Sequence, residues 1–139
     1  MGMRKLVPVV AIATALSAWP ATAGESVKPS VTHDCFSVAR RPADIVFACG
    51  DAGFRAEDLR WRHWGRERAV GRGRFLFNDC DPGCAVGRLR ERRGRIRLLD
   101  PQWCEDAAVT VFSVAHIRYD RAWQGRRRVI WTLDCPMEL

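Results

Sequence analysis

The stretch LRWRHWGRERAVGRGRFLF, residues 59–77, alternates between two kinds of side chain. Apolar or small residues occupy most of its odd positions, from Leu59 and Trp61 to Phe75 and Phe77. The even positions carry all six of its arginines: Arg60, Arg62, Arg66, Arg68, Arg72 and Arg74. Successive side chains of a strand point to opposite faces, so the alternation predicts β-strands with an apolar inner face and arginines outside.

A second arginine series follows in residues 88–99, and its parity changes at Arg93-Gly94. The change is consistent with a two-residue hairpin turn there or with one strand that contains a β-bulge. Both arrangements predict a single arginine face, and the hairpin would place like charges opposite one another. We therefore favour the bulged strand, with these candidate binding residues: Arg88, Arg90, Arg92, Arg95 and Arg97.

Further apolar runs at residues 44–49, 109–119 and 129–135 also predict strands, the last two joined by a loop at 120–128. Residues 53–60 are compatible with a single helical turn. The sequence predicts an all-β fold, a small antiparallel sandwich or barrel of about six strands, held together by disulfides.

The N-terminus has the organisation of an export signal. Arg4 and Lys5 precede an apolar run, and Ala21-Thr22-Ala23 forms a small-x-small cleavage pattern. We predict a signal peptide over 1–23 with cleavage near Ala23, a flexible lead-in over 24–34 and one β domain over 35–139. The apolar run is too short for a comfortable membrane span, so no transmembrane anchor is expected in the mature chain.

Export places the cysteines where disulfides persist, and their even number allows 15 pairings. If 109–119 pairs with 129–135, the end of the last strand returns beside Cys104, which favours Cys104–Cys135. Cys35–Cys49 and Cys80–Cys84 then follow by elimination. Cys80 and Cys84 enclose Asp81-Pro82-Gly83, which is turn chemistry without further metal ligands, so we predict neither a metal nor a cofactor.

The chain is strongly basic, with a net charge of +7 that falls to +5 when Arg4 and Lys5 are removed. This charge favours an acidic partner, although an arginine-rich composition also arises from a GC-rich genome. The histidines His33, His63 and His116 are the candidates for general-base catalysis. By parity, Trp61 and Trp131 belong in the core, whereas Trp64 and Trp123 lie among arginines.

Several strings occur in order along residues 42–101: IVFACGD, LRWRHWG, AVGRG and NDCDPGCAVG. They resemble a group of small secreted bacterial proteins, mostly actinobacterial, with the pattern ACADG…LxWxxWG…AxGxG…NDCxPxCAxG. The resemblance implies a secreted protein with a related fold and implies no reaction. Arg92-Arg93-Gly94 departs from the Tyr-Pro-Val that many of these proteins carry.

Together these features predict a secreted, non-enzymatic binding module. Its expected partner is an acidic envelope polymer or an extracellular protein, and nucleic acid is not favoured. The alternatives are a small ribonuclease-like hydrolase that uses two histidines and an extracellular protease inhibitor that uses residues 79–86 as a rigid loop.

Overall fold

The computed structural model describes Gly2 and residues 27–138. The predicted export signal over 1–23 and its cleavage site lie outside these residues, except for Gly2. No helix in the described part of the chain is long and apolar enough to cross a membrane.

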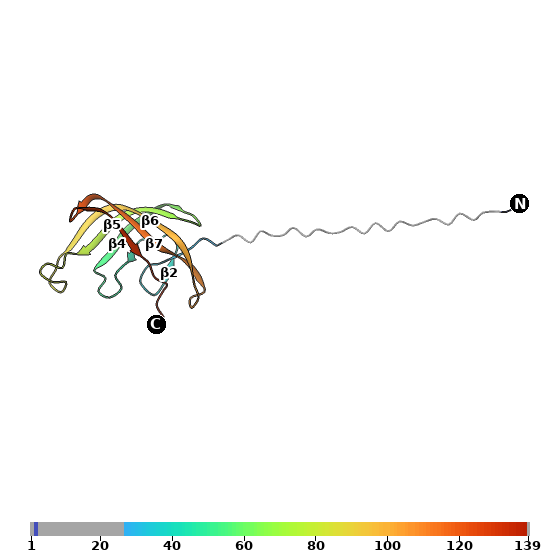
Figure 1. The fold of residues 1–139 in the computed structure, drawn as a ribbon, viewed down its shortest axis with the longest axis horizontal. Coiled ribbons are helices and arrows are strands. Elements are labelled where there is room, and N and C mark those ends of the chain that lie inside the picture. Colours follow the sequence, from blue (N-terminus) through green and yellow to red (C-terminus); the bar gives the residue numbers. More distant parts are fainter. Residues whose placement is uncertain (1, 3–26, 139) are drawn as a thin grey trace.

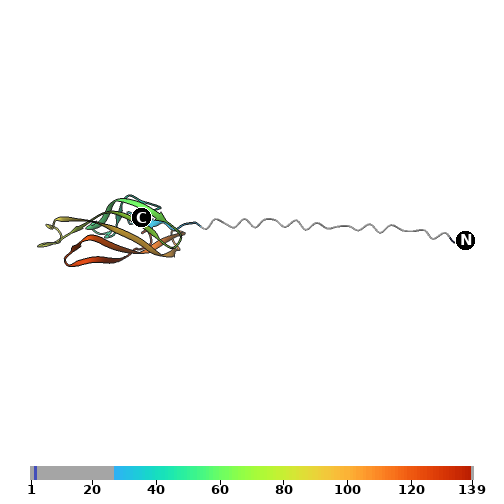
Figure 2. The same ribbon diagram turned by 90° about the horizontal axis from the view of Figure 1, so that it is seen from above.

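Residues 27–138 form an all-β structure, as predicted. A six-stranded antiparallel sheet has the order β3-β4-β5-β6-β7-β8, so each strand lies beside its neighbour in sequence. The sheet curls into a half-barrel that arches over the short N-terminal strands and the C-terminal segment (Figure 1). Seen from above, it extends from the green β4 to the red β8 (Figure 2). The strands are β1 (Val31–Thr32), β2 (Val38–Ala39), β3 (Ile45–Val46), β4 (Phe54–Trp64), β5 (Ala69–Asn78), β6 (Leu89–Cys104), β7 (Val109–Trp123) and β8 (Arg126–Thr132).

The concave side of the sheet holds the hydrophobic core. Phe75, Phe112 and Ile96 are fully buried there, and Trp61 and Trp131 pack against the core as their parity predicted. The rings of Trp131 and Phe54 meet edge to face with centroids 5.1 Å apart, a favourable aromatic geometry. This contact joins β8 to β4 and closes part of the curl.

Residues 29–34 are part of the fold, so the prediction of a flexible lead-in is wrong for this segment. Val31 is fully buried and pairs with Ala39. The Ser30 N–H donates to the carbonyl of Thr110 at 2.9 Å. The polar sequence concealed this role. Backbone hydrogen bonds to a distant strand hold the segment, and such bonds require no periodic pattern of side chains.

Two register shifts in β4 change which side chains face the core. One lies between Glu57 and Arg60, the other between Trp61 and His63. The second shift turns Trp64 inward, where it is 4% exposed. The prediction that Trp64 lies among the arginines is therefore wrong. Residues 54–60 belong to this strand and form no helical turn.

β6 is one continuous strand, so neither a hairpin nor a bulge occurs at Arg93-Gly94. Its register with β5 runs unbroken from Asn78↔Leu89 to Ala69↔Leu98. Gly94 is instead a point of close approach, because a Cβ there would lie 2.6 Å from the carbonyl oxygen of Arg118. As a consequence, Arg88, Arg90 and Arg92 share one parity and Arg95 and Arg97 the other, so a single face cannot hold all five.

The hairpin between β7 and β8 is tighter than the predicted loop at 120–128. Both strands extend to a two-residue turn at Gln124-Gly125, and both turn residues have positive φ. Such turns match the twist of the flanking strands. The disulfides are those predicted: Cys35–Cys49, Cys80–Cys84 and Cys104–Cys135.

Candidate functional site

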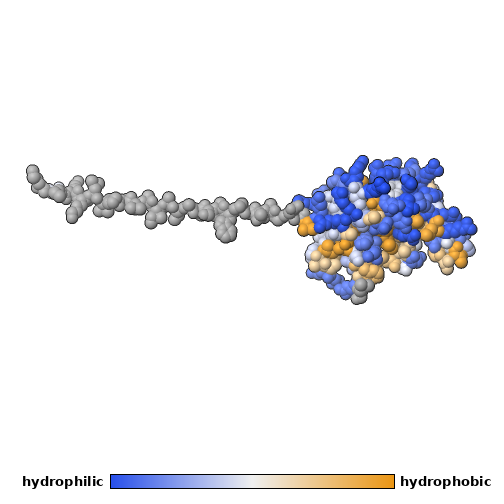
Figure 3. Space-filling view, turned by 180° about the vertical axis from the view of Figure 1, so that it is seen from behind, coloured by the Kyte–Doolittle hydropathy of each residue, from blue (hydrophilic) through white to orange (hydrophobic). Residues whose placement is uncertain are grey.

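The convex face of the sheet carries a row of arginines that crosses five strands. Cross-strand pairs link each arginine to the next: Arg60↔Arg72, Arg72↔Arg95, Arg95↔Arg118 and Arg118↔Arg128. We call these five residues the arginine row, and all five are exposed. Neighbouring strands lie about 4.8 Å apart, so the row is about 19 Å long. Figure 3 shows hydrophilic residues gathered over the upper surface of the molecule, the convex side in Figure 1.

Two hollows lie on this face and meet at Arg95. The first has a volume of about 620 Å³ and is bordered by arginines of β4, β5 and β6, including Arg62 and Arg93. The second measures about 380 Å³ and is bordered by Arg97, His116 and the far end of the row. The long side chains of the row therefore stand apart and leave open space between them.

Carboxylates neutralise only part of this face. Arg72 is paired with Asp120, with Nη2 of Arg72 donating to Oδ1 at 2.9 Å and to Oδ2 at 2.7 Å. For Arg60, Arg95, Arg118 and Arg128, no carboxylate oxygen among residues 27–138 lies within 4.0 Å of a guanidinium nitrogen. Like charges directly opposite one another are destabilising in a sheet, so the row is a place where bound anions would stabilise the protein.

Arg74 lies beside the row but is fully engaged by acids. It contacts Asp58 at 2.7 Å, Glu91 at 2.9 Å and Glu57 at 3.1 Å. Its hydrogen bonds to Asp58 and then to Glu91 raise the pKa of its guanidinium. Arg74 is thus a structural cross-link between β4, β5 and β6 and has little capacity left for an external anion.

The other predicted binding arginines are dispersed. Arg66 and Arg68 lie at the exposed turn between β4 and β5. Arg90 is paired with Asp79 at 2.9 Å. The Arg92 guanidinium lies 5.1 Å from the ring centroid of Trp123, which packs against the core. Arg88 supplies its backbone N–H to Asp79.

Sequence reasoning missed several arginines of the convex face, among them Arg93, Arg118 and Arg128. For Arg118 a signal was present, since Ala115, Ile117 and Tyr119 are buried on alternate positions of β7. That alternation places Arg118 on the outer face. Arg128 follows the same parity through its pairing with Arg118.

The histidines do not form a common site. His63 and His116 are both on the convex side, but they belong to β4 and β7, three strand spacings or about 14 Å apart. Among the described residues neither has a hydrogen bond to a carboxylate. His33 lies 4.0 Å from Asp34. This geometry gives no support to a two-histidine hydrolase.

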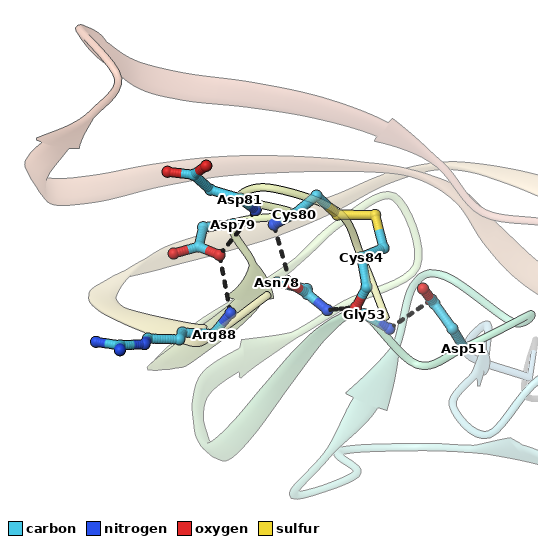
Figure 4. The surroundings of a disulfide bond; sticks show 8 residues. All are labelled: Asp51, Gly53, Asn78, Asp79, Cys80, Asp81, Cys84 and Arg88. Atoms are coloured by element: carbon cyan, nitrogen blue, oxygen red, sulfur yellow. Dashed lines mark hydrogen bonds between the residues drawn. A yellow bond between two sulfur atoms is a disulfide. The ribbon is translucent and has the colours of Figure 1, made fainter. Parts of the chain in front are cut away.

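The loop between β5 and β6 is firmly braced (Figure 4). Asn78 accepts from the N–H of Cys80 and donates to the carbonyl of Cys84, across the disulfide. Asp79 accepts from the N–H groups of Arg88 and Asp81. The hydrogen bond from Arg88, followed by those from Asp81 and the Arg90 side chain, lowers the pKa of Asp79. We call residues 78–88 the braced loop, and its Val86 is 68% exposed.

No cluster of three or more metal-ligating side chains occurs in the described part of the chain. Comparison of the whole chain with protein-family models, with curated proteins and with solved structures gives no match. The arginine row and its two hollows are therefore the feature on which a functional assignment has to rest.

Proposed function

We propose that this protein is a secreted, non-enzymatic binding module that attaches to an acidic polymer of the cell envelope through the arginine row. The observation that carries the proposal is the alignment of five exposed arginines across five strands, four of them without an acidic partner among residues 27–138. An anionic polymer would relieve the repulsion between these neighbours and gain charge-assisted hydrogen bonds from their guanidinium groups.

The chemistry of the face favours a polymer without bases. Sequence-tolerant binding of single-stranded nucleic acid relies on aromatic platforms, and neither hollow is lined by Phe, Trp or Tyr. The arginine row itself crosses five strands of a sheet, a surface wider than the helix or two-stranded ribbon that a DNA groove admits. Carboxylate or phosphate groups on an envelope polymer can pair with the guanidinium groups without an aromatic platform or a groove-binding element.

Export is a part of the same proposal. Three disulfides support it, because such bonds persist in oxidising compartments outside the cytosol. The sequence resemblance to small secreted actinobacterial proteins points in the same direction.

A double substitution at the centre of the row tests the binding proposal. We expect Arg95→Gln with Arg118→Gln to elute from a heparin column at clearly lower salt than the parent, because exposed ion pairs are screened by salt. The matched control is Arg40→Gln with Arg41→Gln, which removes the same charge from exposed residues between β2 and β3. Equal shifts in both variants would mean that net charge alone governs retention, and the proposal would fail.

A second candidate function is the docking of an extracellular protein, such as a protease, on the braced loop. The observation in its favour is the support of this loop by hydrogen bonds to Asn78 and Asp79, together with the exposure of its Val86. Inhibition of a panel of secreted proteases by the intact protein, and its loss in Val86→Asp, is the expected result. Absence of inhibition by the parent would remove this candidate.

A further inference from the structure

We infer that the polymer lies across the strands, along the arginine row, and that the site selects a linear polyanion with charges about 5 Å apart over at least about 19 Å. This inference rests on the proposed function and adds the direction, spacing and minimum length of the ligand.

The first step is the continuity of positive charge in each direction. Side chains on one face of a strand repeat every two residues, or about 6.7 Å. Along β6 the side chains on the convex face include three arginines in succession, Arg93, Arg95 and Arg97. Glu91 precedes this series and Leu99 follows it. Along β7, Arg118 stands between His116 and Asp120. Only the cross-strand direction offers five arginines in succession.

The second step is the space around the row. The two hollows lie on either side of Arg95 and follow one another in the direction of the row, the first over β4–β6 and the second over β6–β8. Anionic groups of a chain that runs across the strands would enter both hollows. A chain that runs along β6 would pass between them and leave Arg60 and Arg128 unused.

The third step is the chemical class. A guanidinium group binds carboxylate and phosphate alike through paired N–H donors. The row therefore specifies regularly spaced oxyanions on a flexible, unbranched backbone. Two envelope sources carry this chemistry, an acidic polysaccharide with one carboxylate per sugar and a polyol phosphate chain, and both can be presented separately as probes.

Two charge-matched double variants test the direction of binding. Arg60→Gln with Arg128→Gln removes the two ends of the row, whereas Arg93→Gln with Arg97→Gln removes the two neighbours of Arg95 along β6. The probes are uronic acid oligomers of graded length and, in a separate arm, glycerol phosphate oligomers of graded length. Affinity is measured by titration calorimetry at fixed salt, and thermal unfolding confirms that both variants fold.

For the parent we expect affinity to rise steeply up to about five charges and only slowly beyond that length. Removal of the row ends should weaken binding of long oligomers about tenfold and leave trimers almost unchanged. The variant without Arg93 and Arg97 should lose less affinity for long oligomers than the variant without the row ends. The arm with the stronger length dependence identifies the source of the oxyanion.

Equal losses in the two variants, or a larger loss from Arg93 and Arg97, would overturn the cross-strand direction while leaving polymer binding intact. A parent protein that binds neither series would overturn the proposed function itself. The two failures are therefore distinguishable in one experiment.

Discussion

Arg72 and Asp120 lie 48 residues apart in the chain, yet one guanidinium nitrogen of Arg72 donates to both carboxylate oxygens of Asp120. This ion pair occupies one member of the arginine row with an internal anion. A polymer that uses the whole row has to compete with Asp120 for Arg72.

Asp120→Asn should therefore strengthen polymer binding. The change removes the internal competitor and frees Arg72. Because surface ion pairs are worth about 0.2–1 kcal/mol, we expect affinity to rise by a factor of about 1.4 to 5. Asp106→Asn is the control, since it makes the same change of charge at an exposed position between β6 and β7. If both variants gain equally, Asp120 acts only through net charge.

Gly94→Ala should destabilise the fold. A Cβ at this position would lie 2.6 Å from the carbonyl oxygen of Arg118 and 3.1 Å from the Cα of Tyr119, so β6 and β7 would have to separate. Overpacking of this kind costs about 1–3 kcal/mol in the free energy of unfolding, which chemical denaturation measures. Gly83→Ala is the control because a Cβ at Gly83 would have no atom of another residue within 4 Å, its chain neighbours aside. A Gly94→Ala variant as stable as Gly83→Ala would contradict the close approach.

Tyr119 should ionise at unusually high pH. It is the single tyrosine of the chain, and burial raises its pKa from 10.0 to about 12. Between these values the unfolded state binds fewer protons than the folded state, so stability should fall by roughly 2 kcal/mol as the pH rises. Absorbance of the phenolate band follows the titration directly. Tyr119→Phe should lose this component of the pH dependence, and an ordinary midpoint near pH 10 in folded protein would refute the prediction.

Asp79 should make the braced loop sensitive to acid. Its pKa is lowered chiefly by the hydrogen bond from the Arg88 N–H, so its contribution to stability is complete above the ordinary aspartate pKa. The contribution is lost as the pH falls through the lower, folded-state pKa. The amide resonance of Arg88 should follow this titration in NMR spectra. Asp79→Asn should speed exchange of that amide, whereas Asp81→Asn should not, because the Asp81 carboxylate accepts none of the hydrogen bonds found in the described loop.

The exported protein should begin near Gly24 and contain no free thiol. The Ala21-Thr22-Ala23 pattern and the three disulfides motivate this expectation. Intact mass spectrometry before and after alkylation without reductant provides the measurement. A mass that retains residues 1–23, or uptake of the alkylating agent by native protein, would count against it.

The sequence alone predicted an all-β domain and favoured the Cys104–Cys135 bond, with the other two pairs following by elimination. The alternation in residues 59–77 is a local property, because neighbouring side chains of a strand must point to opposite faces. The predicted return of the last strand beside Cys104 likewise needed only an antiparallel hairpin, and the Cys104–Cys135 bond confirms it.

Only the tertiary structure decided which arginines meet. Register shifts in β4 turned Trp64 inward, and the unbroken pairing of β5 with β6 sent Arg92 and Arg95 to opposite faces. The sequence favoured a bulge over a turn at Arg93-Gly94, but Gly94 marks the place where β6 passes close to Arg118. The physical reason is that strand register is set when side chains distant in sequence, such as Phe75, Ile96 and Ile117, are buried against one another. Local alternation contains no information about which residue of another strand lies opposite.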